Sequence, residues 1–180
     1  MRRPLCLLLL AVAACQARAP RPVSEEAEQP VPLHLAGLQR TMLELHNRER
    51  AAVGARPLVW DPRLAAAAAA YGPELARHER LVHSAASARP GQGENLWKGT
   101  HAAYAVETMF AGWANEKRLF RPGLFPRVST TGKWPDVGHY TQVIWQGTER
   151  LGCAVHQTPA WDYLICRYTP PGNVVGRYVP

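Results

Sequence analysis

The sequence has few cysteines, no hydrophobic run long enough to cross a bilayer, and no block of charge of one sign. Four cysteines in 180 residues exclude a small domain held together by many disulfides. The apolar stretch from Leu5 to Ala14 is shorter than the roughly 20 residues that a spanning helix needs. The 21 Lys and Arg residues are scattered among 14 acidic ones, so the sequence gives no support for nucleic-acid binding. No internal repeat is visible.

The N-terminus has the features of an export signal. Two arginines precede the short apolar run, and Val12-Ala13-Ala14-Cys15 matches the lipobox at which bacterial lipoproteins are cut and acylated. Residues 1–14 are therefore predicted to be a lipoprotein-type signal peptide, with Cys15 as the lipidated residue. The alternative is an ordinary signal peptide, cut after Ala13 or Ala19. Gln16 follows the cysteine, and a residue other than aspartate there favours the outer membrane.

These features predict a bacterial outer-membrane lipoprotein that faces the periplasm or the cell surface. If the ordinary signal is used instead, the protein is soluble and is secreted or periplasmic. Residues 15–34 are rich in Pro, Glu and Gln and poor in apolar side chains, so they predict a disordered tether. With 47% apolar residues overall, residues 35–180 are long enough for one core and are predicted to form one domain.

Three helices are predicted ahead of a hairpin. Apolar residues recur at helical spacing from 35 to 52. Asp61 and Pro62 begin a second helix through an alanine run, and we expect that helix to kink or break at Pro73. A third helix is expected from about His101 to Phe120. Glu116 falls on its apolar stripe, where a carboxylate needs a partner.

The hairpin is predicted from alternation in segments 151–156 and 161–166, which flank a Pro-Ala turn. Folding the two strands symmetrically places Cys153 opposite Cys166 on the buried side. Cys6 leaves with the signal and Cys15 is acylated, so a single Cys153–Cys166 disulfide is predicted. Helices around a small antiparallel sheet give an α+β sandwich.

The motifs along the chain resemble, in order, those of the CAP superfamily, which comprises cysteine-rich secretory, antigen 5 and pathogenesis-related 1 proteins. They are His46-Asn47-x-x-Arg50, Pro57-Leu58-x-Trp60-Asp61, Leu81-x-His83-Ser84, Gly93-Glu94-Asn95-Leu96, Trp113-x-x-Glu116, the string from Gly138 to Thr148, and the string from Tyr163 to Val174. The resemblance covers residues 35–180. It implies a three-layer α-β-α sandwich (CAP/SCP domain) with an open cleft.

At the base of that cleft the resemblance implies a tetrad of His83, Glu94, Glu116 and His139. Two imidazoles and two carboxylates are suitable ligands for a divalent metal, zinc most naturally, with His83 and His139 as the metal ligands. The alternative is that the glutamates only hydrogen-bond and orient the histidines, in which case little or no metal binds. The other five histidines lack such carboxylates and are expected to be solvent-facing or capping: His34, His46, His78, His101 and His156.

Three functions fit the sequence. The first is a binding or interaction module of the cell envelope whose cleft holds a small lipid, sterol or peptide; its contact with the membrane would be made through the N-terminal lipid alone. The second is a metal-dependent hydrolase or protease in which Glu94 or Glu116 is the general base. The third is a structural envelope protein. No nucleophile motif supports a triad mechanism, so the sequence favours binding over catalysis.

Overall fold

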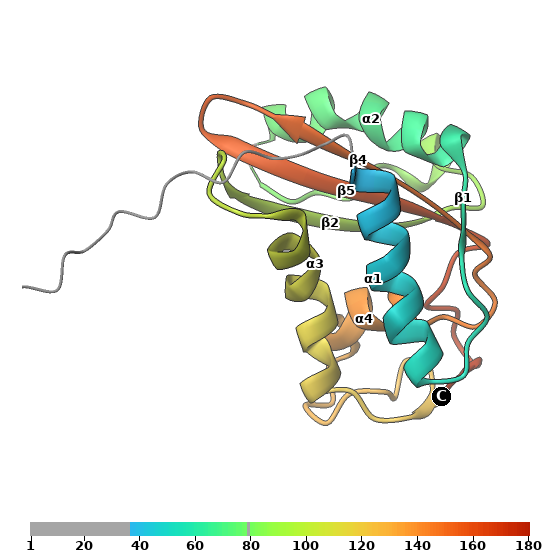
Figure 1. The fold of residues 1–180 in the computed structure, drawn as a ribbon. Helices are drawn as coiled ribbons and strands as arrows, with labels where there is room; N and C mark the ends of the chain where they lie inside the picture. The colour runs from blue at the N-terminus through green and yellow to red at the C-terminus, as the bar shows by residue number, and fades with distance from the viewer. Residues whose placement is uncertain (1–36, 79) are drawn as a thin grey trace, which may run out of the picture.

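The computed structural model describes residues 37–78 and 80–180, and the chain forms a three-layer α-β-α sandwich (Figure 1). The middle layer is a four-stranded sheet in the order β1-β4-β5-β2. The strands are β1 (Val59–Trp60), β2 (Gly93–Thr100), β4 (Arg150–Gln157) and β5 (Trp161–Thr169). Only β1 runs parallel to its neighbour; β4, β5 and β2 are antiparallel. The α+β class and the layered architecture expected from the sequence are confirmed.

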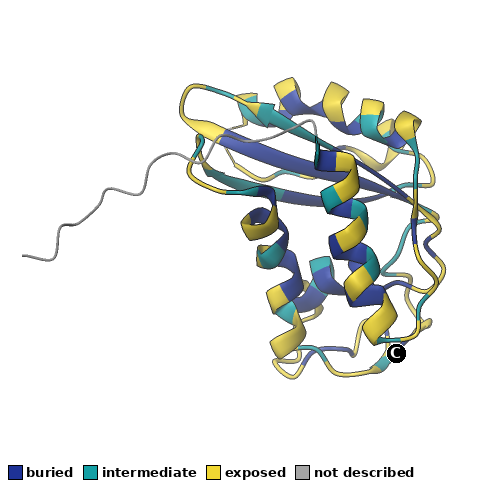
Figure 2. Ribbon diagram, viewed as in Figure 1, coloured by how far each residue is buried: buried dark blue, intermediate teal, exposed yellow. Residues whose placement is uncertain are grey.

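One face of the sheet is covered by α2 (Pro62–Arg77) and the other by α1 (Leu38–Ala52), α3 (Val106–Ala114) and α4 (Gly138–Val143). Strand β5 contributes side chains to the cores on both sides of the sheet, because successive side chains of a strand point to opposite faces. Tyr163 and Ile165 pack under α2, whereas Leu164 and Cys166 belong to the larger core beneath the other helices. The sheet is accordingly the most buried layer, and the helices expose their outer sides (Figure 2).

The hairpin of β4 and β5 has the predicted register. Cys153 lies opposite Cys166, and the two form a disulfide with a Cα–Cα distance of 4.1 Å. Both cysteines are buried, so the disulfide joins the strands inside the larger core.

Helix α2 continues through Pro73 to Arg77, so the predicted break is wrong. Pro73 removes one helical hydrogen bond, from the carbonyl of Ala69. Both residues are exposed, so water can satisfy that carbonyl. The alanine run lets the helix lie close to the sheet: a Cβ at Gly152 of β4 would come within 2.2 Å of the Ala65 nitrogen.

The third helix is shorter than predicted. It begins at Val106 and ends at Ala114, and a 3-10 turn, η3 (Asn115–Arg118), follows it. The start is displaced because the buried Asp162 of β5 accepts the Ala102 N–H at 2.9 Å, and Ala102 has a φ of 54°. That left-handed conformation prevents the helix from beginning at His101.

A second, two-stranded sheet joins β3 (Gly123–Leu124) to β6 (Tyr178–Val179) near the C-terminus. Two further 3-10 turns, η2 (Ala86–Ala88) and η4 (Trp134–Val137), lie in the loops. Within residues 37–78 and 80–180, no helix has the length and apolar character needed to span a membrane. The predicted signal peptide, tether and acylated Cys15 lie outside the described residues, as do Leu35 and His34.

Candidate functional site

Glu94 and His83 form the first of two histidine–carboxylate pairs. Glu94 stands on β2, and His83 lies in the loop between α2 and η2. His83 Nδ1 and Glu94 Oε1 are 2.7 Å apart. The Glu94 side chain is fully buried, whereas 55% of the His83 side chain is exposed. The imidazole is thus held at the surface by a carboxylate that water does not reach.

The remaining bonding capacity of the Glu94 carboxylate is also used. Oε1 accepts the Ser84 N–H, and Oε2 accepts the Ser84 hydroxyl, both at 3.0 Å. The guanidinium of Arg167 on β5 lies 2.9 Å from Oε2. Burial alone would raise the pKa of Glu94, but the bond to His83, the charge of Arg167 and the Ser84 amide outweigh it and lower the pKa below its ordinary value of 4.5. Glu94 is therefore an ionised, fully engaged anchor.

Glu116 and His139 form the second pair. Glu116 Oε1 lies 2.6 Å from His139 Nδ1, and Oε2 accepts the backbone N–H groups of His139 and Tyr140 at 2.9 and 3.0 Å. These amides begin α4, so the carboxylate sits at the positive end of that short helix. The sequence predicted a carboxylate in need of a partner here, and 17% of the Glu116 side chain is exposed.

Arg50 of α1 holds the opposite end of α4. Its guanidinium donates to the carbonyls of Val143, Trp145 and Thr148 at 3.0, 2.8 and 3.0 Å. Burial lowers the pKa of Arg50 to about 10, so the group is still charged at neutral pH. A helix of only six residues is thereby held between an anion at its N-terminus and a cation at its C-terminus, which fixes the place of His139.

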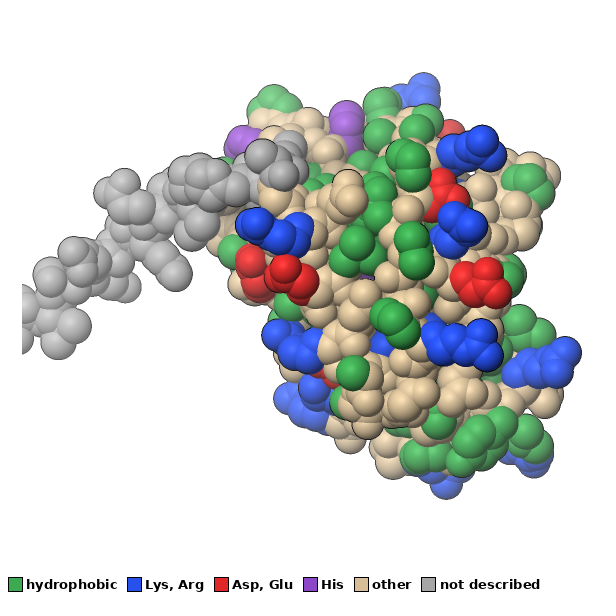
Figure 3. Space-filling view, turned by 45° about the vertical axis from the view of Figure 1, so that its right-hand side comes forward, with side chains coloured by type: hydrophobic (Ala, Val, Ile, Leu, Met, Phe, Trp, Pro, Cys, Tyr) green, Lys and Arg blue, Asp and Glu red, His purple; other side chains and the backbone are tan. Residues whose placement is uncertain are grey.

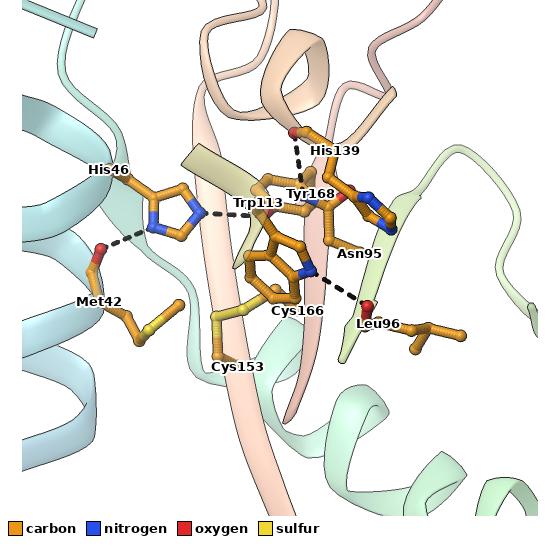
Figure 4. The surroundings of a disulfide bond; sticks show 9 residues. All are labelled: Met42, His46, Asn95, Leu96, Trp113, His139, Cys153, Cys166 and Tyr168. Carbon is orange, nitrogen blue, oxygen red and sulfur yellow. Dashed lines mark hydrogen bonds between the residues drawn. A yellow bond between two sulfur atoms is a disulfide. The ribbon is translucent and has the colours of Figure 1, made fainter. Parts of the chain in front are cut away.

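Buried hydrogen bonds join α1 to β5 and join Asn95 to His139 (Figure 4). His46 Nδ1 lies 2.7 Å from the Met42 carbonyl, which can only accept, so Nδ1 carries the proton. His46 Nε2 therefore accepts from the Tyr168 hydroxyl at 2.9 Å. Separately, the Asn95 side chain donates to the His139 carbonyl at 3.1 Å.

His46 is completely buried, so the expectation of a solvent-facing or capping role is wrong for it. The signal was present in the sequence, because His46 and Arg50 are one helical turn apart beside the apolar Met42 and Leu45. Nothing in the sequence indicated the partners of either residue. His101 is also not free: its Nδ1 lies 2.8 Å from Asp162 Oδ1.

The histidines and Glu94 line a cleft of about 360 Å3. Glu116 is not among its lining residues, because it lies behind His139. The rim adds apolar surfaces from Trp134, Pro135 and Pro171. Amides line the cleft as well, from Asn95, Gln142 and Asn173, and Gln142 Oε1 also accepts the Gly172 N–H at 2.8 Å. The sequence had not singled out Trp134 or Arg89, which also line the cleft.

Each imidazole presents one nitrogen to a ligand. Nδ1 of His83 and of His139 is engaged by a carboxylate, so Nε2 is the nitrogen that remains. The His139 ring is further held by stacking on Trp113, at 6.1 Å between centroids. Among the described residues, no three His, Cys, Asp or Glu side chains are grouped so that they could hold a metal ion.

Known proteins share this arrangement of motifs and fold. The sequence profile of the Cysteine-rich secretory protein family, CAP, matches residues 43–168. The chain belongs to the CAP family. It is 41% identical over 150 residues to pathogenesis-related protein 1C of Nicotiana tabacum, covering 80% of this chain and 82% of that protein. Pathogenesis-related protein 1 of Arabidopsis thaliana is 37% identical over 148 residues, with 82% and 85% covered.

Solved CAP structures share the fold. The zinc-containing crystal structure of NaASP2 superposes with a TM-score of 0.67 at 25% identity, covering 79% of this chain and 84% of that one. An outer surface protein of Borrelia burgdorferi has a TM-score of 0.53 at 14% identity, covering 74% and 92%. The second likeness shows the fold alone.

Proposed function

We propose that this CAP protein is an exported binding module whose cleft holds a small amphipathic ligand, a lipid, sterol or peptide. The observation that carries the proposal is the hydrogen bonding of the two carboxylates, Glu94 and Glu116. Glu94 accepts from three groups besides its ion pair with Arg167, and Glu116 accepts from three. A general base needs a free lone pair within reach of a water. The four acceptor sites of Glu94 are filled, and Glu116 lies behind His139 and does not line the cleft.

The lining of the cleft supports an amphipathic ligand. Trp134 and the prolines offer apolar surface, and the amides and the two Nε2 atoms offer a few fixed polar contacts. This combination is typical of small-molecule sites. In the described chain, Ser84 beside Glu94 is buried and both cysteines are oxidised, so none of these three is an available nucleophile.

Turnover and binding are tested together. Wild type, Glu94→Gln and Glu116→Gln are assayed on a panel of ester and peptide substrates, with and without zinc. The same proteins are titrated with fluorescent fatty acid, sterol and peptide probes, with Trp134→Ala as the cleft variant and Trp161→Ala, an exposed tryptophan on the hairpin, as its control. We expect background turnover throughout and weakened probe binding in Trp134→Ala but not in Trp161→Ala. The glutamate variants should also bind the probes differently, because the carboxylates orient the histidines that line the cleft. Zinc-stimulated turnover that disappears in Glu94→Gln or Glu116→Gln, with the fold intact, would favour the hydrolase.

A divalent metal fits the cleft only as a weakly held ion. The two Nε2 atoms are neutral imidazole donors of the kind that zinc prefers, but tight zinc sites use three or four protein ligands. The glutamates bond the opposite nitrogens, as carboxylates behind metal-binding histidines do. The NaASP2 structure contains Zn2+, which supports the same metal here. Zinc would supply a Lewis-acidic contact for a polar ligand group.

The N-terminal segment is the basis for a proposal about the cellular location of the protein. We propose that the protein is a bacterial lipoprotein acylated on Cys15 and delivered to the outer membrane. Expression in a Gram-negative host with labelled palmitate should give a labelled protein in the membrane fraction, and Cys15→Ser should abolish the label. A soluble wild-type protein with an unmodified N-terminus would show that an ordinary signal peptide is used.

A further inference from the structure

A basic and apolar surface lies at the C-terminal end of the molecule, away from α2. Its apolar members are Leu124, Val175 and Tyr178, which are 48%, 75% and 62% exposed. Leu124 and Tyr178 are directly paired across β3 and β6, so their side chains lie on one face of that small sheet. Surface residues of this size are ordinary when isolated, but a group of them on one face marks an interaction site.

Cations flank these apolar residues along the chain. Residues 117–135 contain five Lys and Arg and no Asp or Glu, in a chain whose charges are otherwise mixed. Arg127 donates its N–H to the Leu124 carbonyl in the turn after β3, and Arg177 immediately precedes β6. In the described part of the chain, the side chains of Arg121, Arg127 and Arg177 are exposed and make no ion pair.

The space-filling view agrees with this distribution. Hydrophobic side chains lie beside Lys and Arg at the lower right of Figure 3, and no Asp or Glu is visible between them. We name the surface formed by Arg121, Leu124, Arg127, Val175, Arg177 and Tyr178 the basic apolar face. Its strands are held to the body by Phe125, which is buried and whose backbone bonds Arg177 and Gly176.

We propose that the basic apolar face docks onto the surface of an anionic lipid bilayer. Interfacial binding combines exposed aliphatic and aromatic side chains, which enter the headgroup region, with Lys and Arg, which are attracted to anionic lipids. Val175 is the most exposed of the large apolar residues described and would enter first, while the unpaired arginines meet the phosphates. Exposed aliphatic residues favour lipid over nucleic acid, whose binding sites rely on polar and stacking contacts.

Docking in this way would bring the cleft to the membrane. Asn173 lines the cleft, and Val174 and Val175 follow it directly into the basic apolar face. The contact is separate from acylation of Cys15 and does not depend on which ligand the cleft holds. Its failure would therefore leave the proposed binding function standing.

The test uses the predicted mature chain, residues 15–180, carrying Cys15→Ser, so that neither the signal peptide nor an acyl group contributes. Co-sedimentation is measured with vesicles of phosphatidylcholine alone and of phosphatidylcholine mixed with phosphatidylglycerol. Wild type should bind only the anionic vesicles and should be released when the salt is raised from about 0.05 to about 0.5 M. Arg121→Glu with Arg127→Glu should weaken partitioning at least about tenfold, since each cation contributes roughly fivefold.

Two further variants make the test specific. Val175→Ser with Tyr178→Ser removes apolar contact without changing charge and should also reduce binding severalfold. Arg63→Glu with Arg77→Glu makes the same charge change on α2 and should lower partitioning much less than the face variant. Thermal melting confirms that each variant is folded.

Three results would overturn the proposal. The first is no binding of wild type to anionic vesicles, or equal loss in both double charge reversals. The second is undiminished binding by the Val175 and Tyr178 variant, which would assign the face to polyanions by charge alone. The third is a concentration-dependent dimer that the face substitutions abolish, which would assign it to a second copy of the chain.

Discussion

His46 and Tyr168 are joined by a hydrogen bond of 2.9 Å across 122 residues of sequence. Both are completely buried, and burial keeps both uncharged: it lowers the pKa of His46 to about 3 and raises the pKa of Tyr168 well above 10.0. Two neutral groups that satisfy each other cost little to bury, whereas either one alone would leave an unpaired polar atom. The pair links the first helix to the strand that backs the cleft.

Removing the Tyr168 hydroxyl should destabilise the protein by about 1–3 kcal/mol, because the buried His46 Nε2 would lose its partner. The variant is Tyr168→Phe, measured by urea unfolding. Tyr178→Phe is the matched control, since Tyr178 is 62% exposed, and it should leave the free energy of unfolding unchanged. Equal unfolding curves for wild type and Tyr168→Phe would contradict the role assigned to the buried bond.

His46 should also make stability depend on pH. In the unfolded chain its imidazole titrates near 6.5, but in the folded protein its pKa is about 3. Between these values the unfolded state binds the extra proton, so the free energy of unfolding falls as pH drops below 6.5, by up to about 1.4 kcal/mol per unit. The contribution of His46 to the stability of the folded protein is fully present above pH 6.5.

A variant that cannot titrate isolates this effect. Gln at position 46 offers an oxygen to the Tyr168 hydroxyl but takes up no proton, so His46→Gln should lose less stability than wild type between pH 6.5 and 5. The free energy of unfolding is plotted against pH for both proteins, and one curve is subtracted from the other. The contributions of the histidines that both proteins share then cancel. A constant difference across that range would mean that His46 takes up its proton as readily in the folded protein as in the unfolded chain, against the lowered pKa.

The sequence predicted those features that depend on local pattern. The β4–β5 register followed from alternation about Pro159 and placed Cys153 opposite Cys166, and both are confirmed. The six alanines and flanking Leu64 indicated a closely packed helix. The family motifs indicated a tetrad of two histidines and two glutamates, but its division into two pairs, Glu94 with His83 and Glu116 with His139, emerged only from the folded chain.

Features set by distant contacts were not predictable in this way. The start of α3 depends on Asp162, which bonds Ala102 from 60 residues away. The role of His46 depends on Tyr168, and the place of α4 depends on Arg50, 93 residues before Val143. A polar residue on the apolar face of a helix indicates that it has a buried partner, but it does not show which residue that partner is.

Neutralising Glu116 should loosen α4. The Glu116→Gln change keeps an oxygen for one amide but removes the charge at the N-terminus of the helix and leaves at least one of its three bonds unmade, a loss of about 1–2 kcal/mol. This loss in the free energy of unfolding is measured by urea denaturation. Glu44→Gln, on the exposed face of α1, removes the same charge and should have little effect. A stable Glu116→Gln protein would imply that Arg50 alone suffices to hold α4.

Zinc binding separates the two interpretations of the tetrad. If His83 and His139 share one ion through their Nε2 atoms, calorimetry should find a single weak site in wild type that is lost when both residues are replaced by alanine. A matched pair, His78→Ala with His101→Ala, removes two histidines outside the cleft and should leave the binding unchanged.

The affinity of the site for zinc should fall as pH drops, since only neutral imidazoles bind the metal. Glu94→Gln and Glu116→Gln should weaken the site by about 10- to 100-fold without abolishing it, because these carboxylates orient the rings. Loss of binding in the His78 and His101 variant, with retention in the His83 and His139 variant, would place the metal elsewhere and leave the glutamates as structural anchors of the cleft alone.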